Sequence, residues 1–109
     1  MTRDEILALK PGSGLDVLAA EKTLRFPAPA YSSDIRAAWE LVDELHARGM
    51  WLSINTLTNV IHVNADSDRP YLRSVTSRPM RLVALSVGES VPHSICLAFL
   101  LATEEQPMG

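Results

Sequence analysis

Two residues that could carry chemistry, His93 and Cys96, lie three positions apart near the end of the chain. Positions i and i+3 of a helix share one face, so the imidazole could lower the pKa of the thiol and activate it as a nucleophile. The surrounding residues favour a structural role, because Ser90 suits a helix cap, Pro92 suits a first turn, and Cys96 belongs to the apolar run ICLAFLLA. We therefore expect a capped, buried helix over residues 92–104.

The sequence pattern does not predict a metal site. The candidate ligands are scattered along it, without the spacing of a zinc motif: His46, His62, His93 and Cys96. The segment NADSDR, residues 64–69, alternates like the start of an EF-hand loop, but Arg69 stands where glycine is required and Val75 where glutamate is required. We predict no metal and no cofactor.

Arginines cluster in the polar segment that follows residue 68. Residues 69–81 carry a charge of +4, which leaves −7 for the rest of a chain whose net charge is −3. Guanidinium groups bind phosphate in bidentate fashion, and a tyrosine ring adds a stacking surface. The segment is a candidate surface for a partner protein or an anionic ligand; a solvated loop, or pairing with the chain's own acidic residues, is the structural alternative. The candidate residues are Arg69, Tyr71, Arg73, Arg78 and Arg81.

Length and composition predict one small domain that spans residues 1–109. Hydrophobic residues make up 47% and charged residues 21%, which is typical of a globular protein rather than a disordered one. The 13 acidic residues outnumber the 10 basic ones, which argues against a general nucleic-acid binder. The single cysteine excludes an intrachain disulfide, and neither a signal peptide nor a membrane span is recognisable. We expect a cytoplasmic protein.

Three helices are predicted in the first half of the chain. The first begins at a capping box of Thr2 and Glu5, and the second covers about residues 15–24. The third has Ser32 or Ser33 as its cap and Gly49 as its stop. Its apolar stripe recurs at intervals of three and four: Ile35, Ala38, Trp39, Val42 and Leu45.

After Gly49 the apolar period changes from 3.6 to 2, which predicts strands. We expect them over residues 50–56, 59–65 and 81–87, with TLTN closing a hairpin between the first two. Residues 71–75 are a candidate fourth strand at an edge. Short connections make the sheet antiparallel, so the fold class is α+β. The last helix is apolar nearly all round and must be covered on more than one side.

Three blocks of sequence resemble one known family. They are MTRDEILALKPGSGLDVLAAEKTL, YSSDIRAAWELVDEL and SVPHSICLAFLLA, and their order and content resemble the phage ABA sandwich domain family of small phage and prophage proteins. The resemblance implies a three-layer helix–sheet–helix sandwich around a small, mainly antiparallel sheet of three to four strands, with N-terminal helices. It implies no mechanism, and Leu97 stands where the family usually has arginine.

Three functional hypotheses follow. The first is a non-enzymatic phage or prophage accessory protein in the cytoplasm of its bacterial host, which binds a host or phage protein and inhibits a host factor or defence system. The second is a binder of a nucleotide or nucleic acid through residues 69–81, although duplex RNA is disfavoured because residues 89–94 contain no Lys or Arg. The third is a small enzyme using His93 and Cys96. Any of these proteins could form a homodimer through a face that contains Trp51.

Overall fold

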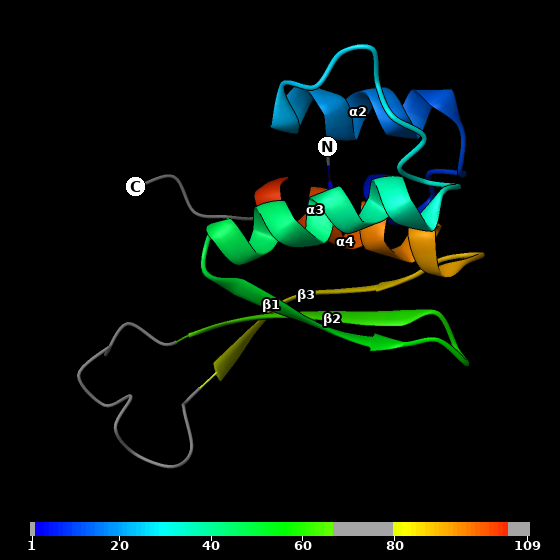
Figure 1. Cartoon of the computed structure of the whole chain (residues 1–109). Coiled ribbons are helices and arrows are strands. Elements are labelled where there is room, and N and C mark those ends of the chain that lie inside the picture. Colours follow the sequence, from blue (N-terminus) through cyan, green and yellow to red (C-terminus); the bar gives the residue numbers. More distant parts are fainter. Residues whose placement is uncertain (1, 67–79, 105–109) are drawn as a thin grey trace.

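Within residues 2–66 and 80–104, which the computed structural model describes, the chain forms four helices and three strands (Figure 1). In chain order these elements are α1 (Arg3–Leu7), α2 (Ser13–Thr23), α3 (Ile35–Ala47), β1 (Met50–Asn55), β2 (Val60–Asp66), β3 (Met80–Val87) and α4 (Val91–Glu104). This order is the one that the sequence predicts. The candidate edge strand over residues 71–75 lies outside the described residues.

Helix α1 begins at the predicted capping box, which is confirmed. Thr2 Oγ1 accepts the backbone N–H of Glu5 at 3.2 Å, and the Glu5 carboxylate accepts the backbone N–H of Thr2 at 2.9 Å. Hydrogen bonds from the backbone and then the side chain of Thr2 favour the ionised carboxylate, so the pKa of Glu5 is lowered. Ile6 is the residue of α1 that enters the core.

Helix α3 is amphipathic, as predicted, but its cap differs from the prediction. Asp34 accepts the backbone N–H of Arg36 at 2.9 Å and is therefore the N-cap, in place of Ser32 or Ser33. Ser32 is instead held by α2, as described below. After α3, Gly49 has φ +82°, in the left-handed region that favours glycine.

The sheet is antiparallel with the strand order β1-β2-β3. Leu52 pairs with Val63 in the first ladder, and Val63 pairs with Ala84 in the second. The predicted hairpin at residues 56–59 is confirmed, and its turn is closed by the Asn55 side chain, which accepts the backbone N–H of Leu57 at 3.0 Å. An irregularity of register follows Val63 in the second ladder and leaves Val83 without a partner residue on β2.

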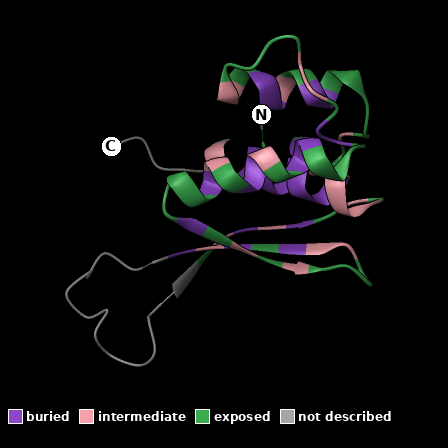
Figure 2. Cartoon of the chain, in the orientation of Figure 1, coloured by how far each residue is buried: buried purple, intermediate pink, exposed green. Residues whose placement is uncertain are grey.

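The elements stack in three layers. The sheet forms one layer, α3 and α4 lie on one of its faces, and α2 packs on α4 from the opposite side (Figure 1). Helix α4 also contacts α1, so it lies at the centre of the molecule. Every side chain from Ile95 to Ala102 is buried, which confirms that this helix is covered on more than one side (Figure 2).

The predicted α+β class, with a three-stranded antiparallel sheet and N-terminal helices, is confirmed. The layers run from the sheet through α3 and α4 to α2, so the outer face of the sheet carries no described helix. Among the described residues, no helix combines the length and the hydrophobicity that crossing a membrane requires.

Candidate functional site

The connection from β3 to α4, residues 86–94, is held by hydrogen bonds between its own polar groups; we call it the β3–α4 junction. Ser86 Oγ donates to the carbonyl oxygen of Ser94 at 2.7 Å, and Ser94 Oγ accepts the N–H of Gly88 at 2.7 Å. A Cβ on Gly88 would lie 2.7 Å from His93 Nδ1 and 2.9 Å from the backbone nitrogen of Ser94. Only glycine therefore fits at this position without a shift of the backbone.

His93 connects the junction to Leu9, two residues beyond the end of α1. Its Nδ1 accepts the N–H of Glu89 at 2.8 Å, which assigns the ring proton to Nε2, and Nε2–H donates to the carbonyl oxygen of Leu9 at 2.8 Å. The side chain of Ser90 accepts the backbone N–H of His93 at 3.3 Å, which confirms Ser90 as the cap of α4. With 3% of the residue exposed and both ring nitrogens bonded, His93 is a structural histidine.

Cys96 lies one turn further along α4 and is fully buried. Burial raises the pKa of the thiol to about 12, and the negative charge of Asp16 acts in the same direction. Almost no thiolate exists at neutral pH under these conditions. The ring nitrogens of His93 point to backbone groups and give no sign of activating this thiol, so the structure supports the structural interpretation of both residues.

A buried polar cluster that the sequence did not reveal links α2 to the segment before α3. Asp16 Oδ1 accepts the backbone N–H of Ser32 at 2.8 Å and the hydroxyl of Ser32 at 2.7 Å. Ser32 Oγ also accepts the N–H of Gly12 at 2.9 Å. Residues sixteen apart in sequence carry no periodic signal, and this pairing could not be predicted. It explains why Ser32 does not cap α3.

Metal ligands do not converge in the described part of the chain. Within residues 2–66 and 80–104, no three His, Cys, Asp or Glu side chains are placed to share a cation. The segment that resembles a calcium loop, residues 64–69, leaves the described residues after Asp66.

Four of the five residues predicted to contact a partner or an anion lie outside the described residues: Arg69, Tyr71, Arg73 and Arg78. The backbone of Arg81 belongs to β3 and pairs with Ala65 of β2. The structure therefore does not bring these five residues together or separate them, and their role stays a prediction.

The face of the sheet that points away from the helices carries unexpectedly many apolar side chains. Its three rows are Trp51, Asn64 and Leu82, then Ser53, His62 and Leu85, then Asn55, Val60 and Val87. We call these nine residues the outer sheet face. The uncovered face of an antiparallel sheet is ordinarily polar, yet Trp51 is 37% exposed here and Leu82 is 55% exposed.

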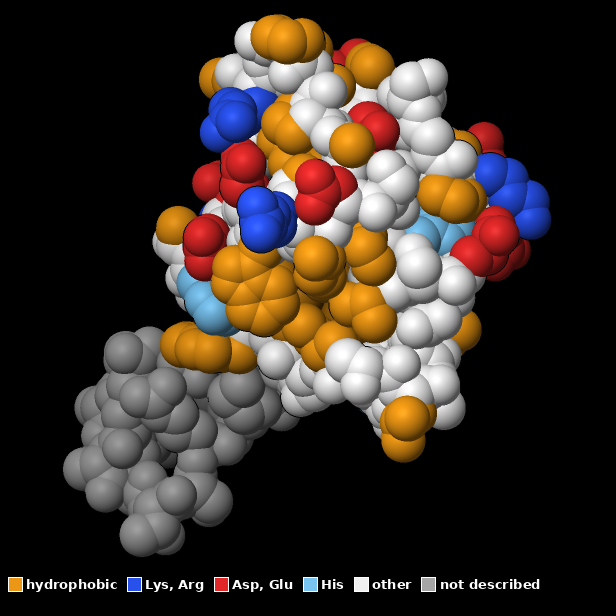
Figure 3. All heavy atoms as spheres, turned by 45° about the vertical axis from the view of Figure 1, so that its right-hand side comes forward, with side chains coloured by type: hydrophobic (Ala, Val, Ile, Leu, Met, Phe, Trp, Pro, Cys, Tyr) orange, Lys and Arg blue, Asp and Glu red, His pale blue; other side chains and the backbone are white. Residues whose placement is uncertain are grey.

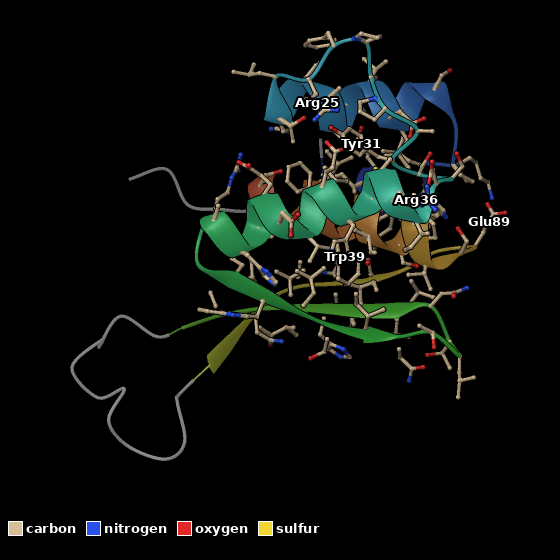
Figure 4. All side chains as sticks on the ribbon, viewed as in Figure 1. Arg25, Tyr31, Arg36, Trp39 and Glu89 are labelled. Carbon is tan, nitrogen blue, oxygen red and sulfur yellow. The ribbon has the colours of Figure 1, made fainter. Side chains whose placement is uncertain are left out.

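A second apolar area lies along α3, on the side toward β1. Ile35 and Trp39 are one turn apart and are 46% and 48% exposed, although the sequence places both in the buried stripe. Leu52 and Ile54 of β1 are half-buried. Figure 3 shows hydrophobic side chains gathered in the middle of one face of the molecule, and Figure 4 shows Trp39 on the sheet side of α3. Helix α3 contacts β1 here, but the described residues leave Ile35 and Trp39 about half exposed.

Two opposite charges border this apolar area. Arg36 and Asp43 form no ion pair with any residue in the described ranges. The charges on the other side of α3 are paired: Glu40 with Arg25 at 2.7 Å, and Glu44 with Arg48 at 3.1 Å. We call Ile35, Arg36, Trp39 and Asp43 the α3 flank.

No family model matches this chain, and no curated protein or solved structure matches it. The resemblance to small phage proteins therefore rests on the three sequence blocks alone.

Proposed function

We propose that this chain is a non-catalytic accessory protein that acts by binding another protein, with the outer sheet face as its contact surface. The observation that carries the proposal is the exposure of Trp51, Leu82 and Val87 on a face that no described helix covers. Apolar side chains among polar ones are typical of protein contact surfaces, where aromatic residues are enriched.

The interior supports binding over catalysis. A catalytic pair would need a base with a free ring nitrogen and a thiol that ionises near neutral pH. Both nitrogens of His93 are bonded to backbone groups, and the pKa of Cys96 is about 12. The residues best suited to chemistry are thus engaged in holding the fold.

We further propose that the partner is a protein of the bacterial host, bound in its cytoplasm and inhibited by the binding. Support for this part comes from the resemblance of three sequence blocks to small phage and prophage proteins.

A comparison of matched variants tests the contact surface. Tagged wild-type protein, Leu82→Glu and Leu24→Glu would be used to recover proteins from a bacterial lysate, with quantitative mass spectrometry as the readout. Leu82 lies on the outer sheet face, whereas Leu24 is an even more exposed leucine that follows α2. We expect at least one protein to be recovered by the wild type and by Leu24→Glu but not by Leu82→Glu. If Leu82→Glu recovers every protein as well as the wild type does, the proposed surface is wrong.

A nucleotide or nucleic-acid ligand is the second candidate, because +4 of charge is concentrated in residues 69–81 of an acidic chain. This candidate predicts oligonucleotide binding that weakens with salt and with Arg73→Ala or Arg78→Ala. Absence of binding across oligonucleotide and nucleotide panels at low salt would remove it.

A further inference from the structure

We propose that two copies of this chain associate about a two-fold axis through the α3 flank, with the β1 strands side by side. This self-association goes beyond the proposed function and uses a different surface from the outer sheet face. The occupant of the α3 flank is thus a second copy of the chain.

A two-fold axis can bring the positive charge of one flank opposite the negative charge of the other. Arg36 lies about 4.5 Å before Trp39 along the helix axis, and Asp43 lies about 6 Å after it. If two α3 helices run antiparallel with the axis near Trp39, each Arg36 comes opposite the Asp43 of the other copy. An isologous contact of this kind requires such symmetry. One operation therefore pairs the two charges of α3 that have no partner among the described residues.

The apolar residues of the flank have the same symmetry. An axis near Trp39 brings the two indole rings together at the centre, with Ile35 of each copy beside them. Tryptophan is enriched among the central, desolvated anchors of protein interfaces, and the contacts around such an anchor exclude water. Burial in a dimer would account for two large side chains that remain half exposed in the single chain.

Strand β1 extends this contact. It is the first strand in the sheet order, and the described residues place no strand beyond Leu52–Asn55. An axis perpendicular to the sheet makes the two β1 strands antiparallel, as it does the two α3 helices, and edge strands associate readily in this way. The described strands of both copies would then form one continuous sheet, and its outer sheet faces would form one surface for a partner.

The size of the flank indicates a weak, reversible dimer. The contact consists of one helix side and one strand edge, each about 20 Å long. Interfaces of this size fall at the small end of specific complexes, below about 1,200 Å² in total. We therefore expect a dissociation constant of the order of micromolar rather than nanomolar.

Sedimentation equilibrium on charge-swapped variants tests the proposal. The variants are Arg36→Asp, Asp43→Arg, the double variant with both changes, and Trp39→Ala. Glu21→Arg on α2 is the control for the net-charge change of +2 that Asp43→Arg makes. Circular dichroism on each variant establishes that it is folded. We expect the wild type and the control to dimerise with the same affinity, and each single reversal to weaken the dimer about tenfold.

The double variant distinguishes a second copy from other occupants. Swapping both charges restores the pairs across the axis, so its affinity should return to within about threefold of the wild type, whereas Trp39→Ala should weaken the dimer about 30-fold. A wild type that stays monomeric up to about 1 mM would overturn the proposal, as would a foreign protein being the only occupant of the flank. Single reversals without effect, or a double variant as weak as the single ones, would equally contradict it.

Discussion

The β3–α4 junction and the α3 flank both bring polar and apolar residues close together. They differ in whether their polar groups are bonded within the described part of the chain. In the junction, Ser86, His93 and Ser94 make hydrogen bonds of 2.7–3.3 Å to groups of the same chain. On the flank, Arg36 and Asp43 have no ion-pair partner among the described residues. The comparison teaches that residue types suited to chemistry can be engaged in holding the fold, and need not mark the surface that we propose for binding.

Burial explains the difference. A buried donor or acceptor that lacks a partner costs roughly 1–3 kcal/mol, so a histidine inside the core must be bonded at both nitrogens for the fold to be stable. An exposed charge is solvated at no such cost and is available to a second molecule. Interior polar groups are therefore bonded within the fold, whereas an unpaired surface charge is free to pair with a second molecule.

The largest effect is expected at Gly88 of the junction. Gly88→Ala would place a methyl group 2.7 Å from His93 Nδ1 and 2.9 Å from the backbone nitrogen of Ser94, so the junction must shift. We expect a loss of about 3 kcal/mol in the free energy of unfolding, measured by urea denaturation. Gly14→Ala is the control, since a Cβ there meets nothing within 4 Å, and it should stabilise α2 by up to about 1 kcal/mol. Equal effects of the two changes would contradict the proposed packing.

A somewhat smaller effect is expected for His93→Phe. The phenyl ring keeps the bulk but leaves the carbonyl oxygen of Leu9 and the N–H of Glu89 without partners. The free energy of unfolding should fall by about 2 kcal/mol. His62→Thr on the outer sheet face should change it by less than about 0.5 kcal/mol. A stable His93→Phe variant would show that the histidine is not kept for structure.

The buried thiol gives a prediction for alkaline pH. The pKa of Cys96 is raised to about 12 from an ordinary value of 9.0, so the folded state retains the proton over this range while the unfolded state loses it. Stability gained from the neutral thiol is complete below pH 9 and decreases toward pH 12, by about 1.4 kcal/mol per pH unit.

The matched variant for this prediction is Cys96→Ala, which lacks the titrating group. The difference in unfolding free energy between wild type and variant should stay constant from pH 7 to 8.5 and then change against the wild type. A constant difference up to pH 11 would mean that the thiol is solvated, and would reopen its role as a nucleophile.

The smallest effect on stability is expected on the α3 flank. Arg36→Ala and Asp43→Ala remove exposed charges that have no partner within the described chain, so each should change the unfolding free energy by less than about 0.5 kcal/mol. The experiment uses dilute protein, where a weak dimer is dissociated. A larger loss would show that these charges stabilise the fold of the single chain. The flank would then resemble the junction, where polar groups stabilise the fold.

Local patterns in the sequence predicted most of the fold. The capping box at Thr2, the amphipathic character of α3 and the alternation of the strands each depend on residues a few positions apart, and each is confirmed, although Ile35 and Trp39 of the predicted stripe are half exposed. The structural role of His93 was also predictable, because Ser90 and the apolar run that follows already indicate a capped, buried helix.

Long-range pairings and the order of the layers could not be predicted in the same way. The bond between Asp16 and Ser32 joins residues that no periodicity relates, and Ser32 was assigned to the cap of α3 for that reason. Apolar residues lie all round α4, so other elements must pack on several of its sides. This pattern does not determine which of those sides packs against the sheet. Likewise, the stripe of α3 includes Ile35 and Trp39, whose exposure depends on how far the sheet extends beneath them.

Hydrogen–deuterium exchange at two protein concentrations tests the central contrast most directly. Exchange would be measured well below and well above the dissociation constant of the dimer, with peptides that cover β1, α3 and the β3–α4 junction. We expect concentration to slow exchange in β1, and to a lesser degree in α3, while the junction remains equally protected at both concentrations. If β1 exchanges at the same rate at both concentrations, or if protection rises in the junction instead, the α3 flank is not where this chain meets its second copy.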